Sequence, residues 1–173
     1  MSLEDLIIRR AEAEDCDGLY EIFTSAKVYP GTLQVPYPSR DYWRRRITEN
    51  TDSVHCLVAL IDDRIVGMVT VVTFPNRPRR RHAGEIAICV HEDWQGKGIG
   101  KELMKTIVEF ADNWLNLTRL ELEVFADNDQ AISLYRHFGF EVEGTMKQHA
   151  FRDGVFVDSI MMGRLRLGRA ESG

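Results

Sequence analysis

The sequence is poor in cysteine and has no long apolar run. Its three cysteines, Cys16, Cys56 and Cys89, are widely spaced and form no C-x-x-C pair, a pattern that fits reduced thiols better than a disulfide framework. The five histidines lack H-E-x-x-H spacing, so no metal site is expected. No apolar segment approaches the roughly 20 residues that span a bilayer, and the charged first residues are unlike a signal peptide. These absences predict a cytoplasmic protein without a membrane partner.

An excess of positive charge is also absent. The formal net charge is −5, whereas a dedicated nucleic-acid-binding protein is usually basic, so no nucleic-acid partner is expected. A chain of 173 residues is long enough for one domain with a substantial core and short for two. We therefore expect a single domain over residues 1–173, with its core at about 5–166 and a frayed tail from Gly168 to Gly173. Monomer and homodimer both remain open.

Hydrophobic periodicity and turn residues predict one α/β domain with a mixed sheet. Two helices follow a first strand, strands and helices then alternate, and a hairpin ends the chain. Segment 29–38, with three prolines, is expected to be a loop. The expected strands begin at Leu6 and then cover 55–61, 64–74, 85–90, 119–125, 140–149 and 154–163. The expected helices are 15–26, a segment capped by Ser39 that carries Trp43 and Ile47, 99–114 and 128–138.

A glycine-rich run, Gln95-Gly96-Lys97-Gly98-Ile99-Gly100, connects the expected strand 85–90 to the helix that follows. Glycine at alternate positions lets the backbone approach an anion, and the free N–H groups and positive dipole of a helix N-terminus favour a pyrophosphate. The spacing matches neither G-x-G-x-x-G nor G-x-x-x-x-G-K-[ST], which excludes a Rossmann or Walker loop. Taken alone, the run is equally compatible with a flexible turn.

The run and its surroundings resemble the GCN5-related N-acetyltransferase (GNAT) superfamily. Gln95, Gly98 and Gly100 match its Q/R-x-x-G-x-G/A motif, and segment 88–90 stands where the family has a splayed fourth strand. The second family motif follows in order, as Asn128, Ala131, Leu134, Tyr135 and Gly139-Phe140. The resemblance covers about residues 84–140. It implies a mixed, mostly antiparallel sheet of about seven strands, flanked by about four helices and splayed between strands four and five.

The resemblance further implies an N-acetyltransferase with acetyl-CoA as co-substrate and no metal. Asn128 and Tyr135 are seven residues apart, so they share a helix face about 10 Å apart, where one can bind the pantetheine arm and the other can lie beside the sulfur. Their alternative roles are a helix N-cap and a core aromatic. The implied cofactor-binding residues are Ile88, Cys89, Val90, Gln95, Gly96, Lys97, Gly98, Ile99, Gly100, Lys101, Asn128 and Tyr135.

Acetyl transfer to an amine needs an oxyanion donor, an acid for the departing thiolate and a base for the amine. The resemblance assigns the donor to the backbone N–H of Val90 and the acid to Tyr135. It also makes Glu85, at the expected start of a strand, the candidate base. The alternative role of Glu85 is an ion pair with the arginines at 79–81.

Two other routes are weaker. His82 and His149 are further base candidates, although a lone histidine is more often structural or solvated. A covalent route through Cys89 is disfavoured, because Glu85 and Cys89 would lie about 13 Å apart along an extended strand and no histidine is placed to assist. Direct attack in a ternary complex is therefore expected.

The acceptor is expected across the sheet from acetyl-CoA, and its predicted contacts are Tyr29, Leu33, Tyr37, Glu85 and Arg152. Segment 29–39 resembles a bacterial GNAT subgroup that includes N-acetyltransferases of free L-amino acids with apolar side chains. An arginine would then bind the substrate carboxylate. Peptide N-termini, aminoglycosides, polyamines and a non-catalytic acetyl-CoA sensor remain open, as does the role of the basic run 77–82, which can meet solvent or the adenosine 3′-phosphate.

Overall fold

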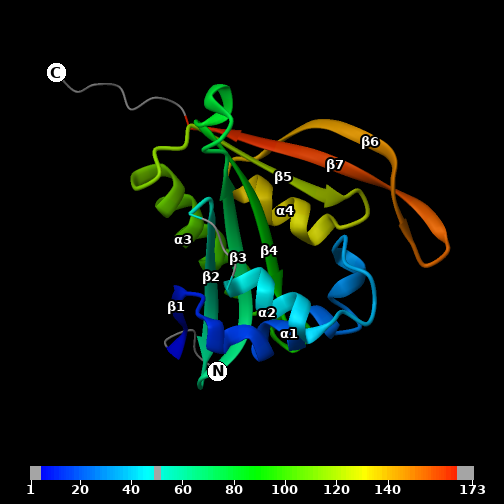
Figure 1. Cartoon of the computed structure of the whole chain (residues 1–173). Helices are drawn as coiled ribbons and strands as arrows, with labels where there is room; N and C mark the ends of the chain where they lie inside the picture. Colours follow the sequence, from blue (N-terminus) through cyan, green and yellow to red (C-terminus); the bar gives the residue numbers. More distant parts are fainter. Residues whose placement is uncertain (1–4, 49–51, 167–173) are drawn as a thin grey trace.

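The described chain forms a seven-stranded sheet in the order β1-β2-β3-β4-β5-β7-β6 (Figure 1). The computed structural model describes residues 5–48 and 52–166, so the tail expected from Gly168 to Gly173 lies outside the described residues. The strands are β1 (Ile7–Arg10), β2 (Val54–Ile61), β3 (Arg64–Thr73), β4 (Ala83–Val90), β5 (Arg119–Phe125), β6 (Glu141–Arg152) and β7 (Val155–Leu165). The helices are α1 (Cys16–Thr24), α2 (Arg40–Thr48), α3 (Ile99–Asn113) and α4 (Asp129–His137). The expected order and the mixed, mostly antiparallel sheet are confirmed.

Two-residue turns close the two hairpins β2–β3 and β6–β7. Asp62 and Asp63 have φ of 48° and 60°, and Asp153 and Gly154 have φ of 49° and 82°. Positive φ at both turn residues matches the right-handed twist of paired strands. Aspartate tolerates this region better than most residues, which explains why the first turn forms without the preferred glycine.

The bounds of three segments differ from the sequence expectation. β4 begins at Ala83, two residues early, because Ala83 and Gly84 pair with β5. Glu85 therefore lies inside the strand and not at its start. β6 continues to Arg152 through two register shifts, and the loop 29–38 contains a single 3₁₀ turn at Tyr29–Gly31.

Two hydrophobic cores lie on opposite faces of the sheet, as the alternation of side chains along each strand requires. The helices α3 and α4 cover the face that carries Ile86 and Leu122. The helices α1 and α2 cover the other face, where Cys89 packs with Leu19 and Trp43. In Figure 1, α1 and α2 lie in front of the lower half of β2–β4, whereas β5, β6 and β7 extend beyond them.

The parallel strands β4 and β5 diverge. Their ladder consists of three pairs, Ala83 with Arg119, Gly84 with Leu120 and Glu85 with Glu121. Beyond Glu85 the two strands separate (Figure 1), so segments 86–90 and 122–125 do not pair with each other. The splay predicted between the fourth and fifth strands is confirmed, and we refer to the region between the diverging strands as the slot.

Candidate active site

The glycine-rich turn leads directly from β4 into α3. Gly96 and Gly98 have φ of 72° and 88°, a region in which residues with a Cβ are strained. The carbonyl of Gly98 accepts hydrogen bonds from the N–H groups of Lys101 and Glu102, at 3.0 and 3.2 Å. The N–H groups of Ile99 and Gly100 precede these and have no intrahelical acceptor. They lie at the positive end of the helix, where an anionic ligand is favoured.

Gly100 serves a different purpose from Gly98, because it has helical dihedral angles. A Cβ at this position would lie 3.4 Å from Leu134 and 3.8 Å from Val90. The glycine therefore lets the first turn of α3 pack closely on α4 and on the end of β4. Beside it, the Lys97 ammonium lies 4.8 Å from the centroid of the Trp94 ring, which places a cation at the same turn.

The end of β4 directs backbone groups into the slot. The N–H of His91 donates to the Val66 carbonyl at 2.9 Å, and hydrogen bonding to a neighbouring strand alternates along an antiparallel pair. The N–H of Val90 therefore points away from β3, toward the side where β5 has diverged. The Gln95 carboxamide donates to the Val90 carbonyl at 3.1 Å, which fixes the next peptide, between Val90 and His91. The Val90 N–H, the candidate oxyanion donor, is thus directed away from β3, and the Val90 backbone also interacts with the neighbouring Cys89 thiol.

Asn128 and Tyr135 occupy the two ends of α4. The Asn128 carboxamide oxygen accepts the N–H of Ala131 at 3.1 Å, so the N-cap role weighed for Asn128 is present. Tyr135 is 7% exposed. Burial raises the pKa of its phenol, and the neighbouring Cys89 raises it further, so the hydroxyl is protonated across the neutral range. Tyr135 packs in the core under α3 and α4, whereas Cys89 packs in the core under α1 and α2.

The cysteine thiols are poor nucleophiles. Cys16, Cys56 and Cys89 are all buried and free. Burial raises the pKa of Cys89 to about 12 and that of Cys56 to about 11, which leaves almost no thiolate at neutral pH. The geometry therefore agrees with direct transfer and not with a covalent acyl-enzyme.

Glu85 has an exposed carboxylate on the face of the sheet that carries α1 and α2. Within the described residues it forms no ion pair. The proposed alternative partners are engaged elsewhere, since Arg80 pairs with Glu121 and Arg81 donates to the Pro75 carbonyl at 3.2 Å. Of the roles considered for Glu85, the ion pair with Arg80 or Arg81 is wrong.

The segment after α1 contacts the β6–β7 hairpin through Arg152. Its guanidinium pairs with Asp127, lies 5.0 Å from the centroid of the Phe125 ring and donates to the Pro30 carbonyl at 3.4 Å. Arg152, one of the arginines considered for a substrate carboxylate together with those at 79–81, is therefore already paired with a carboxylate of the protein.

Three other predicted acceptor contacts lie in this same segment. Tyr29 is half-buried, whereas Leu33 and Tyr37 are 61% and 97% exposed. Tyr37 therefore does not pack the loop against the rest of the protein. Its ring, like the side chain of Leu33, is available to a ligand.

The sequence did not reveal a cluster formed by Glu123 of β5, His149 of β6 and Ser159 of β7. Nδ1 of His149 lies 2.8 Å from a Glu123 carboxylate oxygen and 3.2 Å from the Ser159 hydroxyl. His149 had been read as a lone histidine because its partners are distant in the chain. No local sequence motif predicts this cluster, because it depends on three strands and on their register.

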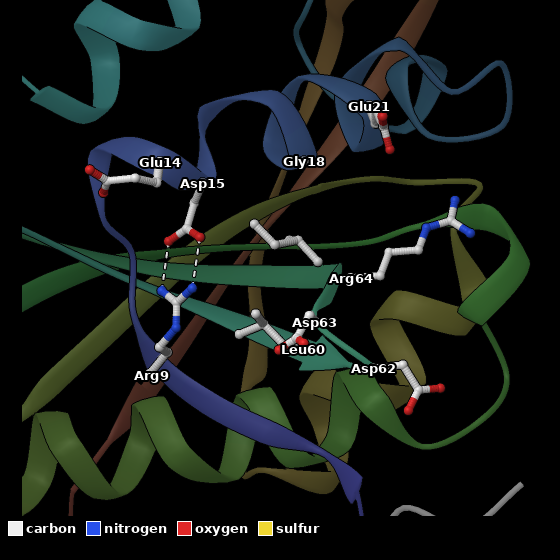
Figure 2. A pocket seen from close by; sticks show the side chains of 10 residues that line it. Arg9, Glu14, Asp15, Gly18, Glu21, Leu60, Asp62, Asp63 and Arg64 are labelled. Atoms are coloured by element: carbon white, nitrogen blue, oxygen red, sulfur yellow. Dashed lines mark hydrogen bonds and ion pairs between the residues drawn. The ribbon is translucent and has the colours of Figure 1, made fainter.

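A cavity of about 520 Å³ lies elsewhere, between α1 and the β2–β3 turn (Figure 2). Arg9 and Asp15, which form the ion pair drawn in Figure 2, are among its lining residues, and none of the predicted site residues lines it. No group of metal-ligating side chains is found within residues 5–48 and 52–166. Over the same residues no helix is long and apolar enough to cross a membrane.

Comparison with known proteins agrees with this geometry. The profile of the acetyltransferase (GNAT) family matches residues 16–140. The chain belongs to the GNAT family. The predicted fold, family and N-acetyltransferase activity are thereby confirmed.

Individual relatives cover nearly the whole chain. The L-amino acid N-acetyltransferase AaaT of Escherichia coli K12 is 40% identical over 95% of this chain and 100% of its own length. The spermidine N(1)-acetyltransferase of the same strain is 27% identical over 93% of this chain and 86% of its own. A phosphinothricin acetyltransferase from Sinorhizobium meliloti, solved in complex with AcCoA, superimposes with a TM-score of 0.84 at 27% identity. That superposition covers 98% of this chain and 92% of the relative.

Proposed function

We propose that this acetyltransferase moves the acetyl group of acetyl-CoA to the amino group of a free L-amino acid by direct attack. The observation that carries the proposal of the acceptor is the 40% identity to an L-amino acid N-acetyltransferase over that relative's full length. The slot between β4 and β5 and the free N–H groups at the start of α3 support a ligand with a pyrophosphate and an extended arm.

Acetyl-CoA supplies an acetyl thioester, and the chain binds, polarises and exchanges protons with it. The N–H groups of Ile99 and Gly100 hold the pyrophosphate, and the side chain of Asn128 lies beside the arm. The N–H of Val90 donates to the acetyl carbonyl oxygen, where negative charge develops during attack. Tyr135, on the α4 side of the slot, gives its proton to the departing sulfur.

The amine approaches from the opposite face, where Glu85 accepts a proton from its ammonium group. The acid and the base are thus separated by the slot. Side chains of paired residues in neighbouring strands point to the same face of a sheet, so Glu121 shares this face with its partner Glu85. Glu123 lies two residues further along β5 and therefore points to the same face. Glu121 is paired with Arg80 and Arg119, and Glu123 is paired with His149.

The charge pattern on this face favours a monoamine over a polyamine. Of these three carboxylates, only that of Glu85 has no ion-pair or hydrogen-bond partner among the described residues. One unpaired carboxylate matches one ammonium group, whereas spermidine carries several charges that would each need a partner. Polyamine acetylation, the activity named for the relative at 27% identity, is therefore the second candidate. Its test is the same substrate panel.

The decisive experiment measures thiol release from acetyl-CoA with apolar and polar L-amino acids, spermidine, an aminoglycoside and a peptide with a free N-terminus. Turnover is expected with apolar L-amino acids. Preference for spermidine would favour polyamine acetylation as the function. No turnover with any amine despite coenzyme A binding would reject the proposal.

The role of Tyr135 is tested by Tyr135→Phe. General acid catalysis contributes about 10²–10⁴-fold, so the turnover number should fall by about that factor, whereas the Kd for coenzyme A should change little. The matched control is Tyr42→Phe, because the Tyr42 hydroxyl accepts a hydrogen bond from Arg46 at 3.1 Å on the exposed side of α2. Equal turnover of Tyr135→Phe and wild type would remove Tyr135 from the acid role.

A further inference from the structure

The Glu123–His149 pair is built as an oriented base. A carboxylate only accepts hydrogen bonds, so the 2.8 Å contact requires that Nδ1 of His149 carries the proton and donates it to Glu123. The other ring nitrogen, Nε2, then holds a lone pair and can accept a proton. The side chain of His149 is 32% exposed, which leaves the ring accessible to a ligand.

A bulge in β6 directs the ring to this place. Met146 pairs with Ser159 and Ala150 pairs with Val157, so three residues of β6 lie opposite one residue of β7. Gln148 has a φ of 51°, and its N–H donates to the Asp158 carboxylate at 2.8 Å. Bulges re-aim side chains and recur next to active sites. Here the bulge turns His149 across β7 to reach Glu123 on β5.

The location of the pair ties it to the slot. Glu121 is the last β5 residue that pairs with β4, opposite Glu85. Glu123 lies two residues further along β5, about 7 Å beyond that point, on the same face and in the part of β5 that borders the slot. The Glu123–His149 pair and Glu85 therefore flank the slot from its two strands. Both lie on the acceptor side, opposite Tyr135.

The acceptor nitrogen releases two protons during the reaction. An ammonium acceptor loses one before attack and one from the nitrogen of the tetrahedral adduct. Glu85 can hold the first of these. A second base on the acceptor face can take the other directly, whereas Tyr135 lies across the slot and starts the reaction protonated.

We propose that His149, held in one tautomer by Glu123, is a catalytic base that takes the second proton from the acceptor nitrogen. The N–H bond breaks, its electron pair stays on nitrogen, and the proton moves to Nε2. As the C–S bond breaks, the sulfur takes the proton of Tyr135. The imidazolium and the Glu85 carboxyl then release their protons, and one of these protons restores Tyr135. One proton per turnover is released overall, and the inference rests on the proposed acetyl transfer to an amine.

Glu123 is the charged group that contacts the ring. The neighbouring charges of the hairpin, Lys147 on β6 and Asp158 on β7, bond each other at 2.8 Å. Ser159, fully buried on β7, contributes a neutral hydroxyl. A change in pH dependence on mutation of His149 or Glu123 can therefore be assigned to this pair.

The test compares pH profiles of kcat and kcat/KM for wild type, His149→Gln, His149→Ala and Glu123→Gln, with an amino acid that the wild type acetylates. The turnover number of His149→Gln should fall about 10²-fold or more with an unchanged Kd for coenzyme A, and the acid limb of the kcat profile should change shape. Free imidazole should restore part of the turnover of His149→Ala. Glu123→Gln keeps the imidazole and loses its anionic partner. Its turnover number should fall less than that of His149→Gln. His137→Gln, an exposed histidine of α4 that contacts Phe138, is the matched control and should behave as wild type.

The outcomes separate this inference from the proposed function. If the wild type turns over amino acids and His149→Gln retains its rate and pH profile, the base role of His149 is wrong and acetyl transfer stands. Loss of turnover without imidazole rescue, together with a lower melting temperature, would assign His149 a structural role and equally overturn the inference. Failure of the wild type with every amine would instead reject the proposed function.

Discussion

The substitution Gly98→Ala separates the two kinds of glycine in the pyrophosphate turn. Gly98 has a φ of 88° at the N-cap of α3, and a residue with a Cβ is less stable in the left-handed region by about 1–2 kcal/mol. The variant either keeps this strain, which lowers stability, or relaxes the turn and must restore it when coenzyme A binds. The loss of folding stability and the loss of coenzyme A binding energy should together equal the strain energy of about 1–2 kcal/mol.

The magnitudes follow from that sum. If the strain remains in the free protein, the melting temperature should fall by about 2–8 °C for a domain of this size. If the turn relaxes, the Kd for coenzyme A should rise by about 5–30-fold. Thermal melts measure the loss of stability, and isothermal titration with coenzyme A on the same sample measures the loss of affinity.

Gly100→Ala is the matched control, because it adds the same methyl group two residues away. Its Cβ would make ordinary contact with Leu134 at 3.4 Å, and alanine is favoured over glycine in a helix by up to about 1 kcal/mol. Stability should be equal or higher, and the Kd for coenzyme A should stay within about twofold. Equal behaviour of the two variants, or a greater loss in Gly100→Ala, would refute the assignment of backbone strain to Gly98.

Three further predictions test the base, an ion pair and the thiols. Glu85→Gln should reduce turnover at neutral pH and recover toward wild type at high pH, where the amine is already neutral; a pH-independent ratio of rates would reject Glu85 as base. Asp15→Asn should destabilise the fold by about 1.5–3 kcal/mol at pH 7. Burial alone would raise the pKa of the Asp15 carboxyl, but hydrogen bonds from Arg9 and from the Glu12 N–H lower it overall. The stability difference should therefore be complete above about pH 4 and vanish as the pH falls through that lowered pKa, as measured by urea melts at several pH values; a constant difference would contradict this account. Alkylation of Cys89 and Cys56 in the native protein at pH 8 should be more than about 100-fold slower than in urea, as read by peptide mass mapping, and rapid native labelling would show that the thiols are accessible.

The strand, glycine turn and helix of residues 83–113 could be predicted from the sequence because their determinants are local. The strand, the positive φ of two glycines and the helix start lie within a few residues of one another, and each is encoded by the residues that adopt it. The helix with Asn128 at its cap and Tyr135 on its inner face is local in the same sense. The face of the sheet that each strand residue occupies also follows from simple alternation.

The acceptor side was less predictable because it depends on register. The start of β4 at Ala83 is set by pairing with Arg119, which no property of segment 83–85 reveals. The partners of Arg152 and His149, namely Asp127 and Glu123, lie on segments far away in the chain. The bulge that turns His149 toward β5 carries no glycine or proline to mark it. The positive φ of Gln148 is unusual for a residue other than glycine, and nothing in the sequence predicts it.

The raised pKa of Tyr135 makes its phenol a weaker acid, which argues against the proposed acid role. A free thiol has a pKa of about 8.5 and an unperturbed tyrosine about 10, so a buried phenol would not readily protonate a thiolate that was solvated as in water. Tyr135 is buried, at 7% exposed, so its surroundings provide less solvation than water. Cys89, whose charge would raise the pKa of Tyr135, has its own pKa raised to about 12 by burial. A departing thiolate in the same surroundings becomes a stronger base by the same cause, and this brings the sulfur and the phenol toward matched proton affinity. The proposed acid role of Tyr135 therefore requires that water be kept from its surroundings, and a variant that admits water beside Cys89 should lose turnover even with Tyr135 intact.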